Sequence, residues 1–428
     1  MPDKSTLEIE IEKNMVLINR VDDLDILIDS IKNKRVVMLG EASHGTEEFY
    51  RMRRIITQQL IRDHAFSFVA IEGDWPDADR LNRYIKTGTG GNARQVLTQN
   101  KRWPTWMWAN DEIVKLAEWM RNEGAGFHGL DMYSLFESIS EVVGYMKKNS
   151  PKLALEIEKR YSCFKPFGGD EIAYARSLVK FPSGCEQEVV ANLKQMLELR
   201  VQDVEKNGDA LFSAIQNAYI ISSAETYYRS MFAASENGWN IRDGHMMDTL
   251  DRLLENSGEG AKGIVWAHNT HIGDYRATDM EKNGYINLGG LARQSYGDDN
   301  VALVGFGSYQ GQVLASHAWE GLEEIMNLPP GKANSYEDYF HRVSVSKKAR
   351  QFYLVLNRER SKILSQKLAH RAVGVVYHPE HESRGNYVPT ELAKRYDAFV
   401  YIDQTTALKS LHTPAVRGEF PETWPSGL

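Results

Sequence analysis

Residues 35–46 read Arg-Val-Val-Met-Leu-Gly-Glu-Ala-Ser-His-Gly-Thr, an apolar run that ends in glycine and is followed by polar residues. The apolar part, residues 35–40, predicts a short buried strand. From Thr46 to His64 the apolar residues recur at intervals of three and four, which predicts an amphipathic helix. A strand, a polar loop and a helix in this order are typical of a parallel sheet covered by helices.

The same pattern recurs along most of the chain. Six more short apolar runs predict strands, and segments with helical periodicity separate most of them. We therefore predict an α/β fold with a mostly parallel central sheet flanked by helices. The six further runs are residues 66–71, 126–130, 263–267, 301–306, 372–377 and 398–402.

Residues 132–260 interrupt the alternation, because their pattern is almost wholly helical. We predict that they form an all-helical insertion that covers the carboxyl ends of the strands. Residues 1–131 and 261–428 then form the α/β core. The predicted helices of the insertion are residues 135–148, 151–161, 183–207, 210–236 and 242–255.

Composition excludes several classes of protein. The 428 residues are 42% hydrophobic and 25% charged, as in ordinary soluble proteins, and the net charge of -7 argues against nucleic-acid binding. Two cysteines, Cys163 and Cys185, are too few for a disulfide framework or a thiolate zinc cluster. No stretch approaches the ~20 apolar residues that span a bilayer, and the first residues do not resemble a signal peptide. We expect a cytoplasmic protein with reduced cysteines that acts on a small molecule, not on nucleic acid or membrane; its oligomeric state stays open.

Polar residues follow the first four predicted strands at their carboxyl ends. Ligands bind at these ends in open α/β sheets, so we expect the polar side chains to line one cleft. The first strand is followed by Glu41 and His44, the second by Glu72, the third by Asp131, and the fourth by His268 and His271.

His44 is the candidate general base. It precedes a predicted helix, whose N-terminal dipole disfavours an imidazolium, and a neutral imidazole accepts protons at neutral pH. Glu41 and Glu72 follow apolar residues, and a buried carboxylate needs a partner. One of them is expected to orient His44 and the other to position a water or a substrate hydroxyl. A structural ion pair with an arginine of residues 51–54 is the alternative.

His268 and His271 are expected to stabilise an oxyanion or to act as a general acid. Together with His44 and Glu72 they could instead hold a divalent metal ion, although the His-Glu-x-x-His spacing is absent. We predict no cofactor and keep this metal site as an alternative. Arg242 is expected to bind a carboxylate or to polarise a carbonyl.

Three tryptophans, Trp103, Trp106 and Trp108, lie within six residues of one another. They are expected to wall an apolar substrate pocket or, alternatively, to pack a helix on the sheet. The chain has no G-x-S-x-G nucleophile elbow, no phosphate-binding P-loop and no G-x-G-x-x-G after its first strand.

Residues 40–46, Gly-Glu-Ala-Ser-His-Gly-Thr, resemble the erythromycin esterase family, and further matching blocks follow in the family's order. The resemblance implies hydrolysis of a macrolide lactone ester, without a metal or at most with debated metal assistance. The attacking water would be activated by the histidine that matches His44, and Glu72 would match a second essential acid. Some relatives are labelled succinoglycan biosynthesis proteins, and the wider superfamily includes haem-binding and peptidase-like members. The further blocks are Phe49 with Arg53, residues 71–72, 82–85, 106–108 and 129–131, Arg242-Asp243 with Met246, and residues 266–273.

These observations predict a hydrolase of a carboxylic ester or lactone, with antibiotic resistance by macrolide cleavage as the role that the resemblance implies. The alternatives are a metal-dependent hydrolase in the same cleft and a protein that binds haem or another small molecule without turnover. Thr249 and Asp274 depart from the family's pattern, so the substrate pocket is expected to differ. The predicted catalytic residues are His44, Glu72, Glu41 and His268, and the predicted substrate-binding residues are Arg53, Arg242, His271, Trp106, Trp108 and Asp131.

Overall fold

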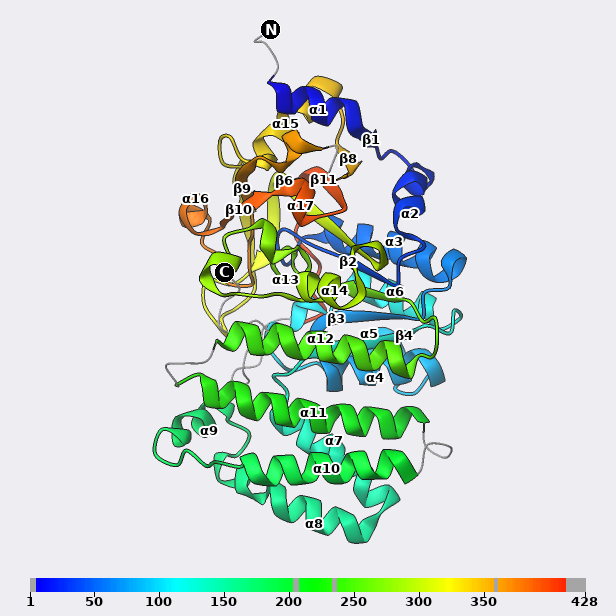
Figure 1. Cartoon of the computed structure of the whole chain (residues 1–428), viewed down its shortest axis with the longest axis vertical. Helices are drawn as coiled ribbons and strands as arrows, with labels where there is room; N and C mark the ends of the chain where they lie inside the picture. The colour runs from blue at the N-terminus through cyan, green and yellow to red at the C-terminus, as the bar shows by residue number, and fades with distance from the viewer. Residues whose placement is uncertain (1–4, 203–207, 233–236, 358–360, 413–428) are drawn as a thin grey trace.

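A computed structural model describes residues 5–202, 208–232, 237–357 and 361–412. Its centre is a nine-stranded sheet with helices on both faces, which confirms the predicted α/β fold (Figure 1). Within the described ranges no helix is both long and apolar enough to cross a bilayer. The strands lie in the order β1 (Met15–Leu17), β8 (Gln351–Val355), β11 (Ala398–Thr405), β6 (Val301–Ala315), β2 (Val36–Leu39), β5 (Gly263–Trp266), β3 (Phe68–Asp74) and β4 (Gly126–Asp131), and β7 (Glu324–Leu328) pairs with β6.

The six strands from β11 to β4 are parallel, whereas β1, β7 and β8 are antiparallel to their neighbours. All four residues of the central strand β2 are buried, as expected of a parallel strand that is covered on both faces. Val37 and Leu39 face one apolar core, and Val36 and Met38 face another. This alternation divides the helices between two layers.

The first layer packs against Val37 and Leu39 and contains α2 (Asp25–Ile31), α3 (Glu47–His64), α5 (Ala93–Leu97) and α6 (Asp111–Met120), with most of the apolar face of α4 (Trp75–Thr87). The second layer packs against Val36 and Met38 and contains α1 (Thr6–Asn14), α12 (Gly238–Asn256), α14 (Leu288–Tyr296), α15 (Tyr336–Lys347) and α17 (Leu392–Arg395). Two further single-turn helices are α13 (Asn269–Ile272), which begins just after β5, and α16 (Glu382–Gly385).

Six of the seven predicted strands are confirmed, and the prediction of a strand at residues 372–377 is wrong. These residues form a loop that makes two isolated bridges, Val373 to Ser43 and Val376 to Ser316. Val373 pairs with the loop that carries His44, and Val376 pairs with the residue that follows β6, so no continuous ladder forms. The strands that the apolar pattern missed are short: β1 at the edge of the sheet, β8 between β1 and β11, β7 off the central path, and the separate pair β9 (Lys367–Arg371) and β10 (Tyr387–Glu391).

The insertion is helical where the structure describes it, and the predicted segments 203–207 and 233–236 lie outside the described residues. Its helices stack in Figure 1 beyond the β4 side of the sheet, and α12 packs directly on β4. The outer helices share an apolar core of their own, and α12 carries Arg242 to Asp131 at the end of β4. These helices are α7 (Leu135–Asn149), α8 (Pro151–Tyr161), α9 (Glu171–Leu178), α10 (Glu186–Gln202) and α11 (Gly208–Ser230).

The two cysteines are not reduced, contrary to the sequence-based expectation. Cys163 and Cys185 form a disulfide whose Cα atoms are 5.9 Å apart. The bond ties the 3-10 helix Ser162–Phe167 to the residue that precedes α10, and α9 lies in the closed loop. A single pair 22 residues apart carries no sequence signal, because only the packing of the helices brings the two sulfurs together.

We predict that unreduced protein, unfolded in denaturant, has no titratable thiol. Replacing both cysteines, Cys163→Ser with Cys185→Ser, is expected to lower the free energy of unfolding by about 2–4 kcal/mol, because the open chain gains conformational entropy. Chemical denaturation of wild type and double variant measures the difference. Two reactive thiols per unreduced chain would contradict the disulfide.

Candidate functional site

Glu41 and His44 form a hydrogen-bonded pair just beyond β2. Nδ1 of His44 is 2.9 Å from Oε1 of Glu41, and Nη2 of Arg53 donates to the other carboxylate oxygen at 2.9 Å. All three side chains are buried. In the neutral tautomer that donates from Nδ1 to Glu41, Nε2 of His44 is a proton acceptor, and it has no hydrogen-bond partner among the described residues. This is the arrangement of a general base oriented by a carboxylate.

The turn that carries His44 is fixed by its backbone. Gly45 has a φ of +71°, and a Cβ at this position would lie 2.0 Å from the carbonyl oxygen of Leu314, so the turn requires glycine. The amide of His44 donates to the carbonyl of Val373 at 3.1 Å. These contacts hold the imidazole ahead of α3, which begins at Glu47.

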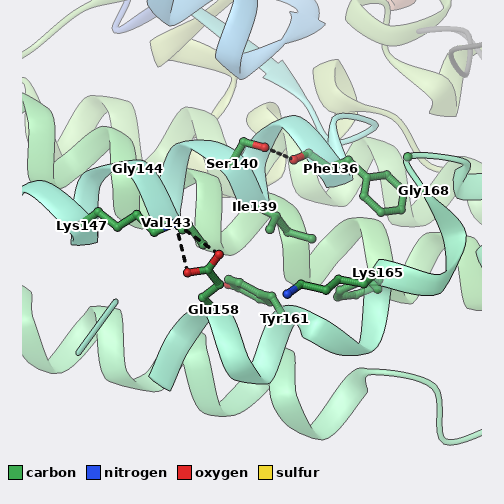
Figure 2. Close-up of a pocket in the computed structure, with 12 residues that line it drawn as sticks. Phe136, Ile139, Ser140, Val143, Gly144, Lys147, Glu158, Tyr161, Lys165 and Gly168 are labelled. Carbon is green, nitrogen blue, oxygen red and sulfur yellow. Dashed lines mark hydrogen bonds and ion pairs between the residues drawn. The ribbon is translucent and has the colours of Figure 1, made fainter. Parts of the chain in front are cut away.

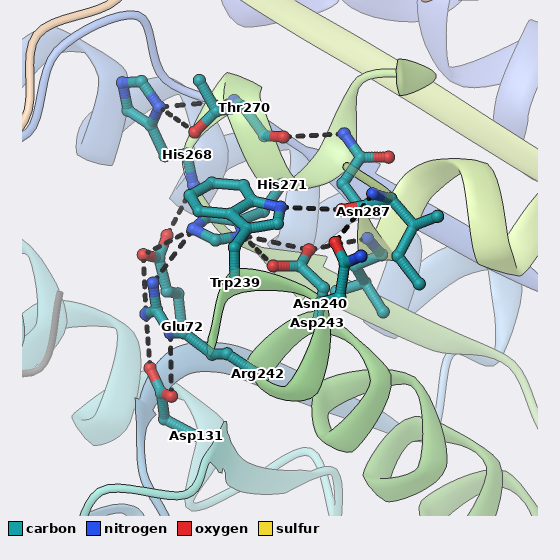
Figure 3. A network of polar contacts seen from close by, with 12 residues as sticks. Glu72, Asp131, Trp239, Asn240, Arg242, Asp243, His268, Thr270, His271 and Asn287 are labelled. Carbon is teal, nitrogen blue, oxygen red and sulfur yellow. Dashed lines mark hydrogen bonds and ion pairs between the residues drawn. The ribbon is translucent and has the colours of Figure 1, made fainter. Parts of the chain in front are cut away.

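A second group of charged side chains gathers at the ends of β3 and β4 (Figure 3). Arg242 of α12 donates from Nε and Nη2 to the two oxygens of Asp131 at 3.0 and 2.5 Å. The same Nη2 donates to Oε1 of Glu72 at 3.0 Å. The arginine therefore joins the carboxylates of two adjacent strands to the insertion, and all three side chains are buried.

His271 completes this group as a cation. Its Nδ1 lies 2.9 Å from Oδ2 of Asp243, its Nε2 lies 3.3 Å from Oε1 of Glu72, and the ring of Trp239 stacks on it at 4.5 Å. Burial lowers the pKa of the imidazole, but Asp243 and Glu72 outweigh both burial and the nearby Arg242 and raise the pKa to about 9. At neutral pH His271 is therefore an imidazolium that donates from Nδ1 to Asp243 and forms an ion pair with Glu72, and Nη1 of Arg242 lies 3.1 Å from its Nε2.

His268 is neutral, in contrast to His271. Burial, and after it the neighbouring His44, hold the pKa of His268 well below its ordinary value. Its Nδ1 accepts from the amide of Thr270 at 3.3 Å, which places the ring proton on Nε2. That atom is buried and has no hydrogen-bond partner among the described residues. The centroids of the His268 and His44 rings are 4.8 Å apart, so two imidazoles whose Nε2 atoms have no partner among the described residues are neighbours.

Glu72 connects the two halves of the site. Its Oε2 accepts from the amide of His268 at 2.8 Å, while Oε1 faces Arg242 and His271. Burial raises the pKa of a carboxyl, but His271 and Arg242 outweigh burial and hold the pKa of Glu72 well below its usual range. Glu72 therefore stays ionised, and its contacts fix the position of His268 beside His44.

Residues 61–405 match the family model described as erythromycin esterase. The chain belongs to the erythromycin esterase family. Among curated proteins, it is 25% identical over 321 residues to erythromycin esterase type II of Escherichia coli, covering 69% of this chain and 74% of that protein. Erythromycin esterase type I of Escherichia coli is 21% identical over 270 residues, covering 59% of this chain and 65% of that protein.

Two solved structures share the fold of this erythromycin esterase family member. A succinoglycan biosynthesis protein superposes with a TM-score of 0.76 at 21% identity and covers 94% of this chain and 97% of its own. A mutant erythromycin esterase in its open conformation gives a TM-score of 0.63 at 15% identity. The superposition covers 90% of this chain and 94% of that structure. At these identities the likeness establishes the fold.

Three further residues predicted for the site, Trp106, Trp108 and Arg53, are buried behind the polar side chains. The indole N–H of Trp108 donates to the carbonyl of Glu72 at 2.8 Å, and Trp106 is buried in the apolar core. The guanidinium of Arg53 is fully buried and binds Glu41. This contact corresponds to the structural ion pair that the sequence analysis kept as an alternative. Substrate contact by these three side chains stays a prediction.

Sequence reasoning missed Trp239, which stacks on His271, and Tyr133, whose ring lies 5.2 Å from the guanidinium carbon of Arg242. Trp239 precedes Arg242 by three residues on the same helix, and this spacing was a usable signal. Tyr133 lies in a loop just after β4 and carried none.

No group of three or more His, Cys, Asp or Glu side chains in the described ranges is placed to hold a metal ion. Nδ1 of each of the three histidines contacts a protein side chain, and Arg242 supplies the positive charge beside Glu72. A site without a cofactor stays a prediction.

A separate pocket of about 460 Å³ lies in the insertion, between α7, α8 and the 3-10 helix that follows α8 (Figure 2). Its walls are mainly apolar, and Lys147 and Glu158 form an ion pair at 3.1 Å on its lining. None of the predicted site residues lines this pocket, so it is distinct from the polar groups at the strand ends.

We predict that the charge on His271 stabilises the folded protein at neutral pH and that this stabilisation is lost at alkaline pH. The pKa of its imidazole is about 9 in the folded protein and about 6.5 in the unfolded chain, so its contribution is full below about pH 6.5 and is lost as pH rises through 9. The full contribution corresponds to about 3 kcal/mol. Chemical denaturation between pH 6 and 10 should show wild type and His271→Asn converging in stability as pH rises. A constant difference would contradict a charged His271.

Proposed function

We propose that this member of the erythromycin esterase family hydrolyses a carboxylic ester or lactone with a water molecule that His44 activates. Family membership, and the esterase names of two curated relatives, support a hydrolase. One observation carries the mechanism: His44 is oriented by Glu41, its ring centroid lies 4.8 Å from that of His268, and neither Nε2 has a hydrogen-bond partner among the described residues.

The proposed reaction begins when Nε2 of His44 takes a proton from water as the water oxygen attacks the ester carbonyl carbon. The carbonyl π bond becomes an oxyanion, which accepts a hydrogen bond from the neutral Nε2–H of His268. The oxyanion then reforms the carbonyl and breaks the bond to the alkoxy oxygen. That oxygen takes the proton from His44, so an acid and an alcohol leave and the imidazole is again neutral.

Glu41 and Arg53 act on this reaction through His44. The carboxylate of Glu41 stabilises the imidazolium that forms, and Arg53 occupies its other oxygen, so Glu41 faces His44 in one orientation. Glu72 acts at greater range, because it holds the backbone of His268 and balances the charge of Arg242.

Replacing His44 with alanine is expected to lower kcat by about 10²–10⁴-fold, the usual contribution of a general base. His341→Ala is the control: His341 of α15 also forms a histidine–carboxylate pair, with its Nδ1 2.8 Å from Asp403 of β11, and it is not one of the site residues. Full turnover by folded His44→Ala protein would assign the base elsewhere, and His268 would then be tested.

Replacing Glu41 with glutamine tests the orientation of His44 at nearly constant volume. A glutamine has one oxygen for two neighbouring donors, so its amide N–H must face either Nδ1 of His44 or Arg53. The first arrangement forces the wrong tautomer and the second sets two donors against each other. We expect at least a 10²-fold loss of kcat at unchanged secondary structure by circular dichroism. Wild-type turnover would show that Glu41 does not control the tautomer.

The macrolide lactone is the first substrate class to test, because two of the curated relatives are named erythromycin esterases. A panel of macrolides and simple esters, incubated with the protein and analysed by mass spectrometry, should show a product that has gained one water. If only simple esters are cleaved, the proposed hydrolase activity stands but its substrate class is not a macrolide.

A further inference from the structure

The side chain of Asn269 makes hydrogen bonds that the backbone of a β-strand would otherwise make. Its Nδ2 donates to the carbonyl of Phe306 at 2.7 Å, and its Oδ1 accepts from the amide of Phe306 at 3.2 Å. Phe306 lies within β6, and β2 pairs with this strand in parallel as far as Leu39 and Val304. The amide of Gly40 then donates to the carbonyl of Val304 at 2.9 Å, which continues the ladder by one bond.

A longer ladder between β2 and β6 would use the same two groups of Phe306. The bonds of a parallel pair are evenly spaced, so the next two would join the Phe306 amide to the carbonyl of Gly40 and the Phe306 carbonyl to the amide of Ala42. The carboxamide of Asn269 takes both places. A Cβ on Gly40 would lie 2.1 Å from Oδ1 of Asn269, so the carboxamide lies directly against Gly40. The chain is therefore free to leave β6 after this glycine.

The backbone of Asn269 holds the part of the chain that leaves. Its amide donates to the carbonyl of Glu41 at 2.9 Å, and the carboxylate of Glu41 in turn binds His44. Asn269 directly follows His268, whose ring centroid lies 4.8 Å from that of His44. One residue thus connects the loop that carries His44 both to β6 and to the end of β5.

A buried histidine fixes the orientation of the Asn269 carboxamide. Nε2 of His370 is 3.2 Å from Nδ2 of Asn269, and Nδ1 of His370 is 2.6 Å from Oε1 of Glu337. Burial outweighs the charge of Glu337 and lowers the pKa of His370, so the ring is neutral. With its proton on Nδ1, toward Glu337, the ring accepts at Nε2. An inverted carboxamide would place its oxygen against this lone pair and against the carbonyl of Phe306, so one orientation is allowed.

We propose that Asn269 is a positioning residue for the reaction: it replaces β2 on β6 and so holds the loop of Glu41 and His44 away from β6, where His44 acts as the base. The inference rests on the proposed function. Without the carboxamide, the amide and the carbonyl of Phe306 would be buried without partners, which costs free energy. Extension of β2 by two residues would satisfy both groups, and it would draw the loop toward β6.

Asn110 is the matched control for Asn269. It is also fully buried, its Nδ2 donates to the carbonyls of Trp106 and Met107 at 3.2 and 2.9 Å, and its Oδ1 accepts from two backbone amides. None of these partners belongs to β2, β5 or β6. Aspartate in either position removes the donors at nearly constant volume. An effect that comes only from the loss of buried hydrogen bonds would therefore appear in both variants.

The experiment compares kcat, KM and thermal unfolding of wild type, Asn269→Asp and Asn110→Asp on an ester that wild type cleaves. We expect Asn269→Asp to lower kcat by about 10–10²-fold with KM changed less than about threefold, because His44 is misplaced while substrate contacts are kept. Asn110→Asp should keep the wild-type kcat, although both variants should unfold at a lower temperature. An unchanged kcat in folded Asn269→Asp, or an equal loss in Asn110→Asp, would overturn the inference. If a buried aspartate prevents folding, Asn269→Ala and Asn110→Ala make the same comparison without a buried charge.

Crystal structures of wild type and of the folded Asn269 variant test the inference independently of turnover. In the variant we expect the amide of Ala42 to bind the carbonyl of Phe306, and Nδ1 of His44 to lie beyond hydrogen-bond distance of the Glu41 carboxylate. The same position of the His44 loop in both structures would overturn the role of Asn269. If no ester is cleaved, the proposed function fails, and the two structures still decide whether Asn269 positions this loop.

Discussion

The buried carboxylate of Glu72 is the constraint on which the site depends. Without water around it, an ionised carboxylate is stable only if charges and donors surround it, and here they come from three separate elements. The amide of His268 fixes the end of β5, Arg242 brings in α12, and His271 brings in α13. Breaking one of these contacts would leave a buried charge uncompensated, which costs far more than an exposed ion pair contributes. The fold around Glu72 is therefore restricted to arrangements that bring all three elements together.

The core of this arrangement could be predicted from the sequence because its signals are local. Residues 35–46 contain a strand, a polar loop and a helix start, and the loop residues Glu41 and His44 are neighbours through a turn. The parallel sheet orders its carboxyl ends along one edge, so Glu72, Asp131 and His268 follow from the strand positions alone. The alternation of apolar residues on β2 likewise assigns helices to both faces.

What the sequence could not predict depends on contacts between distant residues. Arg242 lies 111 residues from Asp131 and 170 from Glu72, and no periodicity connects them. The strand expected at 372–377 has the apolar composition of a strand, yet it makes only single bridges, one to the loop before α3 and one to Ser316 after β6, and these partners come together only in the folded chain. The disulfide has the same origin, since α9 and its neighbours must pack before the two sulfurs meet. Local composition thus predicted which elements form, and tertiary contacts decided their pairing.

The two histidines after β5 show how burial and charge produce different chemistry three residues apart. His271 faces two carboxylates and one arginine, and the carboxylates keep it charged despite burial. His268 faces the other way, toward His44, so burial dominates and it is neutral. Three carboxylates, Glu72, Asp131 and Asp243, are opposed by Arg242 and His271, so this half of the site retains one negative charge in excess. That excess favours the imidazolium that forms on His44 during proton transfer, and the neutral His268 adds no opposing charge. The polar cluster therefore does more than hold the strand ends together, because its net charge favours the charged state through which the proposed hydrolysis passes.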